Sequence, residues 1–219
     1  QVFDGGNKIK SVKVISVGKA KTEIDAKYIV TDTRMQIFLP EELAGKGGTV
    51  KVKIEFSFIA PFEGSDRMGV LETKNGKIFT IAQWYPRMCV YDDVRGWNVN
   101  PYLGASEFYL EYGDFEVSIT APSNHIVVCS GELTNPTAVY SIEEQKRLAQ
   151  AKLSDKTVLI RSADEVNSLS KSVSGATKTW NYKIKNARDI SWASSAAFIL
   201  DAAKINLPSG KKSLAISVY

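Results

Sequence analysis

The sequence predicts a mainly β chain, built from antiparallel sheets of a β-sandwich type with one or two short helices. Several segments alternate apolar and polar residues, which is the period of a half-buried strand, and Val50–Phe58 alternates throughout. Asn75-Gly76 stands between two strand-like runs and is the strongest short-range hairpin signal. Many short strands at regular spacing are typical of a sandwich.

The first 58 residues are expected to form strands joined by turns. Ile9–Val17 combines alternation with a short apolar run, and Met35–Leu39 stops at Pro40. In Val50–Phe58 the alternation places charged residues on one face, so that face is expected to meet water. Several glycines mark Glu41–Gly48 as the turn before this strand.

The hairpin at Asn75-Gly76 is expected to join Leu71–Thr73 to Ile78–Ile81, with a strand-like run continuing to Gln83. Further strands are expected at 115–120, 125–130, 157–161, 180–185 and 198–203. The segment 172–178 is polar and is expected to be a turn.

One helix is predicted over 142–153. Ser141 and Glu144 have the spacing of a capping box, and strong helix formers fill the rest of the segment. At helical period Leu148 and Ala151 are expected to pack inward.

A second, shorter helix is possible over 163–170. Ser162 and Glu165 repeat the capping-box spacing at its start.

Length, charge and hydropathy narrow the class of protein. The chain has 219 residues and a net charge of +4, and its lysines are scattered, so nucleic acid is not an expected partner. No stretch is long and apolar enough to span a membrane. We expect one domain over 1–219, cut at both ends from a longer protein.

Candidate catalytic residues are few. His125 is the one histidine and is expected to be structural, and Cys89 and Cys129 are expected to be buried free thiols more readily than a disulfide; their spacing is not a zinc pattern. Asp92 and Asp93 could act as an acid/base pair or hold a cation. Adjacent side chains in an extended loop point apart, which favours turn capping and ion pairing with a neighbouring arginine. No metal site is therefore expected in this chain.

The most unusual segment is 79–115, which holds nearly half of the aromatic residues of the chain together with a group of charges. Aromatic side chains beside paired charges are typical of a groove or an interface. A well-packed β core with a long loop is the plainer alternative.

Two motifs in this region carry a family resemblance. FTIAQWYPRMCVYDDVRGWNVNPYLG, followed by EFYLEYGDFEVSITAPSNHIVVCSGEL, resembles the N-terminal domain of zinc metallopeptidases of the aminopeptidase N family, in a bacterial branch. NARDISWASSAAFILDA is similar to the segment that ends this domain. The resemblance extends from about Leu39 to Ala203.

The resemblance implies a saddle-shaped β domain that covers a thermolysin-like catalytic domain. The zinc-binding H-E-x-x-H motif and the G-x-M-E-N motif belong to that catalytic domain, and neither occurs in this sequence. It therefore implies a fragment without cofactor, a parent enzyme that uses zinc, and two partners: the catalytic domain and a peptide substrate. Bacterial members often carry a signal peptide, so the parent protein is expected to be periplasmic or secreted.

The resemblance also implies roles for individual residues. Gln83 is expected to present an amide to the N-terminal end of a bound peptide, with Trp84 and Tyr85 as walls of the site. Residues 85–93 match the place where the β domain meets the catalytic domain. The expected interface residues are Arg87, Tyr91, Asp92, Asp93 and Trp97.

Three functions are compatible with the sequence. The first is a non-catalytic β domain of a zinc aminopeptidase. The second is a free-standing β-sandwich module that binds a carbohydrate or a peptide. The third is a small hydrolase that uses Asp92 and Asp93. An exposed apolar patch around residues 84–103 is expected for the first and a closed apolar surface for the second.

Overall fold

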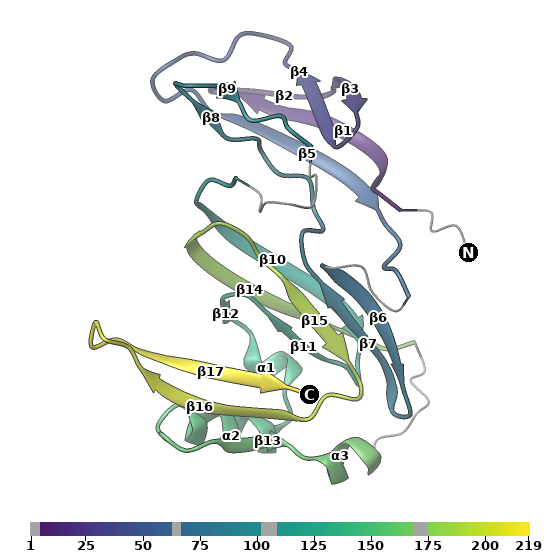
Figure 1. The fold of residues 1–219 in the computed structure, drawn as a ribbon, viewed down its shortest axis with the longest axis vertical. Coiled ribbons are helices and arrows are strands. Elements are labelled where there is room, and N and C mark those ends of the chain that lie inside the picture. Colours follow the sequence, from purple (N-terminus) through teal and green to yellow (C-terminus); the bar gives the residue numbers. More distant parts are fainter. Residues whose placement is uncertain (1–4, 63–66, 102–108, 169–174) are drawn as a thin grey trace. The chain divides into compact units, whose positions relative to one another are not determined.

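The computed structural model describes residues 5–62, 67–101, 109–168 and 175–219. Within these ranges the chain is mainly β, its named strands pair in antiparallel sheets, and its helices are short (Figure 1). This confirms the predicted fold class. The chain forms two compact units, unit 1 within Gln1–Ile59 and Tyr85–Glu111 and unit 2 within Ala60–Trp84 and Tyr112–Tyr219. The assignment of 1–219 to one domain of a larger protein stays a prediction.

Unit 1 consists of a three-stranded sheet in the order β2-β1-β5 and two separate hairpins, β3–β4 and β8–β9. Its strands are β1 (Lys8–Val17), β2 (Ala20–Asp25), β3 (Lys27–Thr31), β4 (Arg34–Phe38), β5 (Val50–Ser57), β8 (Tyr91–Asp92) and β9 (Gly96–Trp97). In β5 exposed and half-buried residues alternate without exception. The predicted wet face of this strand is therefore confirmed.

The interior of unit 1 is thin. Its fully buried apolar side chains, among the described residues, are Val12, Val14, Val17 and Val90. Hairpin β3–β4 buries no side chain fully, since every residue of β3 is exposed. Little apolar surface is thus removed from water within this unit.

Unit 2 contains three antiparallel sheets, in the orders β11-β15-β7-β6, β10-β14-β12 and β13-β16-β17. Its strands are β6 (Met68–Thr73), β7 (Gly76–Ile81), β10 (Gly113–Pro122), β11 (Ile126–Cys129), β12 (Glu132–Leu133), β13 (Val158–Arg161), β14 (Thr177–Ala187), β15 (Trp192–Ser195), β16 (Leu200–Asn206) and β17 (Lys212–Val218). Strand β15 lies between β11 and β7, so segments distant in the sequence meet in one sheet.

The β6–β7 hairpin turns where the sequence predicts it. Gly76 has φ +128, a left-handed conformation that glycine adopts without a steric cost. The Thr73 hydroxyl closes the turn, accepting from the Asn75 N–H at 3.3 Å and donating to the Gly76 carbonyl at 2.7 Å. Turn chemistry alone therefore fixes the register of this hairpin.

Three helices accompany the sheets of unit 2, α1 (Pro136–Val139), α2 (Ile142–Ala151) and α3 (Ala163–Ser168). The predicted capping box of α2 is present, with Ser141 and Glu144 bonded to each other's backbone N–H. Leu148 and Ala151 are buried, as predicted, where α2 packs against β13 and β16.

The helix prediction differs from the structure at the end of α2 and in the absence of α1 from the prediction. Helix α2 ends at Ala151, two residues before the predicted end. The capping box of Ser162 and Glu165 does start α3, and the predicted residues 169–170 lie outside the described part of the chain. Helix α1 was not predicted, because one turn begun by Pro136 is too short to show an apolar period.

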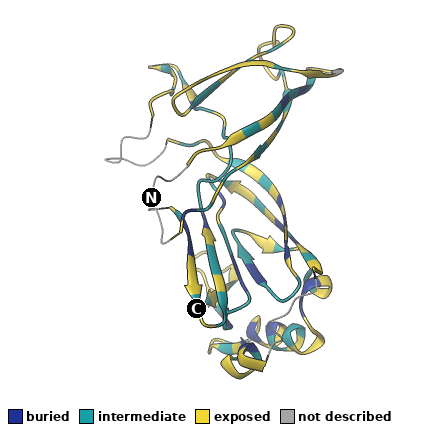
Figure 2. Ribbon diagram, turned by 90° about the vertical axis from the view of Figure 1, so that its right-hand side faces the viewer, coloured by how far each residue is buried: buried dark blue, intermediate teal, exposed yellow. Residues whose placement is uncertain are grey.

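The core of unit 2 is large by comparison with that of unit 1, as the dark blue segments in Figure 2 indicate. Its largest fully buried side chains are Trp180, Ile160 and Leu200. The ring of Trp180 meets that of Tyr140 edge-on, with centroids 5.2 Å apart. Sheets and helices of this unit therefore share one aromatic and aliphatic interior.

Candidate functional site

The β8–β9 hairpin of unit 1 carries half of the site residues predicted from the sequence, namely Tyr91, Asp92, Asp93 and Trp97. Tyr91 pairs with Trp97 and Asp92 with Gly96, which has φ +72. The Asp92 Oδ1 atom accepts the backbone N–H of Val94 at 3.0 Å and of Arg95 at 2.7 Å. Asp92 therefore caps the turn, as one of the two sequence interpretations expected.

Large apolar side chains are exposed around this turn. The exposed fractions are 74% for Met88, 63% for Tyr91, 84% for Val94 and 54% for Trp97. The rings of Tyr91 and Trp97 meet edge-on with centroids 5.1 Å apart, so each limits the motion of the other. We call these four residues the β8–β9 surface.

A buried anchor holds the hairpin in place. Val90 is 1% exposed, and its carbonyl accepts the Asn98 N–H at 2.8 Å. Asp93, next to the anchored turn, is exposed. The hairpin is thus fixed through its base while its aromatic end remains in water.

Tyr85 and Arg87 form a second group of predicted site residues in unit 1. The guanidinium carbon of Arg87 lies 5.6 Å from the centroid of the Tyr85 ring, within the range of a cation–π contact. Both side chains are half-buried. A guanidinium stacked on a ring is a common element of protein interfaces.

Gln83 and Trp84 belong to unit 2, unlike the other predicted site residues. Gln83 has φ +52, a left-handed conformation that is uncommon for a residue other than glycine. The rings of Trp84 and Trp192 meet edge-on with centroids 6.3 Å apart. Sequence reasoning placed Gln83 in a strand-like run, but β7 ends at Ile81 and Gln83 lies in a bend.

The end of the aromatic segment is only partly described. Residues 102–108 lie outside the described part of the chain. The structure therefore describes the predicted patch around 84–103 only as far as residue 101. Tyr109 to Tyr112 lie in no strand. Arg188 of unit 2 stacks on the Tyr112 ring, with 4.7 Å between guanidinium carbon and centroid.

His125 makes contacts within unit 2, and its assignment as a structural residue stays a prediction. Its Nδ1 atom lies 2.8 Å from the Ser194 hydroxyl oxygen, and its ring lies beside that of Phe79. Burial, and then the positive charge of Arg161, hold the pKa of His125 below its ordinary value.

The Arg161 guanidinium beside His125 is itself 4% exposed and donates to the carbonyls of Ala196 at 3.2 Å and Asn124 at 3.5 Å. These contacts connect three segments of unit 2. Neither the guanidinium nor the two backbone carbonyls can act as a nucleophile.

Both cysteines are free, as expected, and they are half-buried rather than buried. Burial raises the pKa of the Cys129 thiol to about 11, so it stays protonated at neutral pH. In the described ranges no three His, Cys, Asp or Glu side chains gather as possible metal ligands. No helix in the same ranges is long and apolar enough to cross a membrane.

Sequence reasoning missed an open pocket in unit 2, which none of the predicted site residues lines. Its lining comes from three sheets and two helices, so no single segment carries a signal for it. Searches against protein-family models, curated proteins and solved structures each find no match to this chain.

Proposed function

We propose that the chain is the non-catalytic N-terminal β domain of a zinc metallopeptidase of the aminopeptidase N family, and that the β8–β9 surface docks on the catalytic domain. The observation that supports this most is the exposure of Tyr91, Val94 and Trp97 on one anchored hairpin and of Met88 just before it. Aromatic and methionine side chains are enriched in protein interfaces. A contiguous apolar patch on a soluble surface commonly marks such an interface.

The thin interior of unit 1 supports the same proposal. A unit that buries four valines gains little from its own core, so an apolar partner surface would add substantially to its stability. The Tyr85–Arg87 stack would contribute a desolvated cation at the edge of this interface. The small core of unit 1 and the Tyr85–Arg87 stack would both suit a domain that folds against a neighbouring domain.

The work of this domain would be to bind and to exclude water. It would form one wall of the substrate cleft, where a shielded site strengthens the polar contacts of the reaction. The side-chain carbonyl oxygen of Gln83 would accept a hydrogen bond from the ammonium group at the N-terminal end of the peptide, with Trp84 as a wall of the site. Zinc, held by the catalytic domain, would polarise the scissile carbonyl and activate water.

The decisive experiment is an assay of the complete gene product. Hydrolysis of leucine 4-nitroanilide should be abolished by 1,10-phenanthroline and restored by zinc, whereas residues 1–219 alone should show no hydrolysis. A complete product without metal-dependent aminopeptidase activity, or full activity in residues 1–219, would contradict the proposal.

Docking can be tested separately in the complete product. Trp97→Ala and Met88→Ser should each weaken docking by about 2 kcal/mol, the size of an interface hot spot, and speed proteolytic separation of the domains. Leu153→Ala is the matched control, because Leu153 is 81% exposed in unit 2, outside the β8–β9 surface. Equal effects of all three variants would argue against this docking surface.

The role of Gln83 has its own test. Gln83→Asn shortens the side chain while tolerating the left-handed backbone, and should raise KM about tenfold through loss of one hydrogen bond to the charged peptide terminus. Unchanged KM and kcat would show that Gln83 does not contact the substrate.

A carbohydrate- or peptide-binding module is the second candidate, favoured by the exposed ring pair Tyr91 and Trp97. Exposed aromatic rings are suited to stacking on the apolar face of a sugar or on a side chain. Calorimetric titration of residues 1–219 with oligosaccharides distinguishes the two. Saturable binding that Trp97→Ala removes would favour this module over the docking domain.

A further inference from the structure

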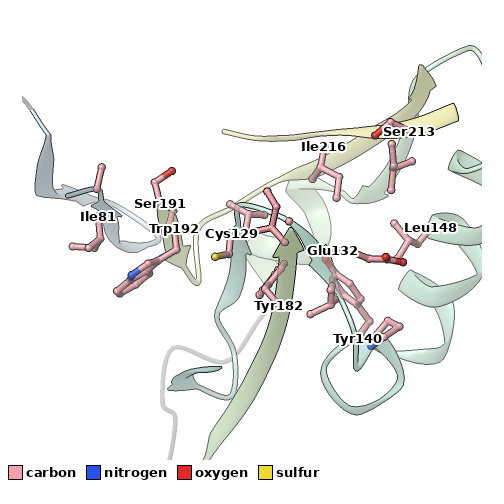
Figure 3. A pocket seen from close by; sticks show the side chains of 18 of the residues that line it. Ile81, Cys129, Glu132, Tyr140, Leu148, Tyr182, Ser191, Trp192, Ser213 and Ile216 are labelled. Atoms are coloured by element: carbon pink, nitrogen blue, oxygen red, sulfur yellow. The ribbon is translucent and has the colours of Figure 1, made fainter. Parts of the chain in front are cut away.

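Unit 2 contains an open pocket of about 1020 Å³ where its three sheets approach one another (Figure 3). In the figure it extends from Ile81 and Trp192 at one end to Leu148 and Tyr140 at the other. Residues of β7, β11, β12, β14, β15 and β17 line it, together with Pro136 of α1 and Leu148 of α2. Rigid elements therefore shape the pocket without a ligand, which is usual for small-molecule sites.

The walls of this pocket are apolar but only partly covered. Val128, Leu133, Ile184 and Leu214 are half-buried, and Ile216 is 47% exposed. A ligand that covered them would gain about 25 cal/mol for each Å² of apolar surface removed from water. The lining therefore favours a ligand with an apolar body.

The aromatic and thiol groups of the lining are not reactive. Burial raises the pKa of Tyr140 and Tyr182 above the ordinary tyrosine value, and the Tyr182 hydroxyl donates to the Val127 carbonyl at 2.7 Å. Cys129 is also protonated at neutral pH. The pocket is thus suited to binding and has no evident nucleophile.

Charges of both signs line the pocket. Lys152 follows α2 one helical turn after Leu148, Lys212 begins β17 beside Ser213, and Glu132 lies on β12. Arg67, just before β6, is a fourth charged lining residue and already takes part in an interaction. Glu132, Lys152 and Lys212 make no ion pair within the described ranges. Their natural neighbours are already engaged: Lys183, opposite Glu132, contacts Glu116 at 2.9 Å, and Asp155, near Lys212, contacts Lys204 at 3.1 Å.

A ligand that complements Glu132, the two lysines and the apolar walls carries one positive charge, one negative charge and an apolar body. We propose that the pocket binds short apolar peptides as zwitterions, with Glu132 attracting the ammonium group and Lys152 and Lys212 the carboxylate. A peptide of a few residues is comparable in size to the drug-sized ligands that such pockets hold. This inference rests on unit 2 alone and does not depend on the proposed aminopeptidase function.

Trileucine is a suitable probe, because its ends can be blocked one at a time. Residues 1–219 should bind it saturably with one site in isothermal titration, and N-acetyl-trileucine amide, which lacks both charges, should bind more weakly. Triserine, which keeps the charges and loses the apolar body, should bind least. The titration uses residues 1–219 without zinc, so its outcome is separate from that of the peptidase assay.

Variants then assign each charge to its residue. Glu132→Gln should weaken trileucine up to about fivefold and leave N-acetyl-trileucine unchanged, since the latter has no ammonium group. Lys152→Met and Lys212→Met should weaken trileucine by similar factors and leave trileucine amide unchanged. Lys211→Met is the matched control, because Lys211 is exposed next to Lys212 and does not line the pocket.

A steric variant checks the location. Ser213 is exposed and lines the pocket, so Ser213→Trp should obstruct part of it and weaken trileucine binding while the circular dichroism spectrum stays that of the parent. Absence of trileucine binding, equal binding of the doubly blocked peptide, or an effect of Lys211→Met as large as that of Lys212→Met would each overturn the proposal.

Discussion

Unit 1 and unit 2 use the same antiparallel architecture but bury different amounts of apolar surface. Unit 2 encloses large side chains such as Trp180, Ile160 and Leu200, whereas the fully buried apolar residues described in unit 1 are four valines. Both units expose some large apolar side chains, and in unit 1 these include residues of β3 and the β8–β9 surface. The contrast indicates that unit 2 is stabilised mainly by its own interior, whereas the interior of unit 1 contributes less.

The largest expected effect is in the core of unit 2. Trp180→Ala should lower its free energy of unfolding by about 3–5 kcal/mol, because a fully buried ring in edge contact with Tyr140 is lost. Urea unfolding followed by far-ultraviolet circular dichroism measures this. A loss below about 1 kcal/mol would mean that the core of unit 2 is not closely packed around this ring.

A smaller effect is expected in the core of unit 1. Val14→Ala should cost about 2 kcal/mol, since Val14 is fully buried and two methyl groups are removed. Hydrogen exchange should speed up at the amides of β1 and β5 and stay unchanged in β10 and β14. Val30→Ala on exposed β3 is the control, with a change within about 0.5 kcal/mol. Faster exchange in both units would show that they unfold as one.

The aromatic pair of the β8–β9 surface should contribute less again. A double-mutant cycle with Tyr91→Ala and Trp97→Ala should give a coupling energy of about 0.5–1.5 kcal/mol, from the edge contact of the two rings. Thermal unfolding of the single and double variants provides it. Additive effects would mean that the rings are not held together in solution.

The smallest expected effect is the pH dependence from His125 in unit 2. The pKa of His125 is lowered by burial and by Arg161, and its other close neighbours, Ser194 and Phe79, carry no charge. The unfolded chain therefore binds the proton first as the pH falls below about 6.5. Stability contributed by neutral His125 is present above that pH and is lost on acidification, by at most about 1.4 kcal/mol per pH unit.

Comparing the parent chain with His125→Gln between pH 5 and 8 measures this contribution. The variant should show the shallower acid dependence, and a steeper one would reverse the sign of the assignment.

Much of the fold could be predicted because its signals are local. The capping box of Ser141 and Glu144, the turn at Asn75-Gly76 and the alternation of Val50–Phe58 each act within a few residues. Pairings such as that of β15 with both β11 and β7 could not be predicted, since apolar alternation shows a face and not its neighbour.

In the candidate sites, too, local features could be predicted from the sequence and contacts between distant segments could not. The turn role of Asp92 depends on residues two and three positions ahead, so the sequence could indicate it. The pocket depends on Glu132, Lys152 and Lys212 meeting from three elements, and spacing along the chain does not encode that meeting. The contact of Tyr91 with Trp97 could not be predicted, because it depends on the register of the short β8–β9 pair.

The left-handed backbone of Gln83 restricts which replacements report on its side chain. Only glycine, asparagine and aspartate adopt that conformation at low cost, and a β-branched residue there would be strained by steric contact with its own main chain. Valine or threonine at this position would therefore disturb the backbone between β7 and Trp84, whatever the amide does. Glycine, by contrast, would remove the side-chain amide of Gln83 and tolerate the left-handed backbone. A Gln83→Gly variant would therefore report on substrate recognition by the side chain and not on a distorted main chain.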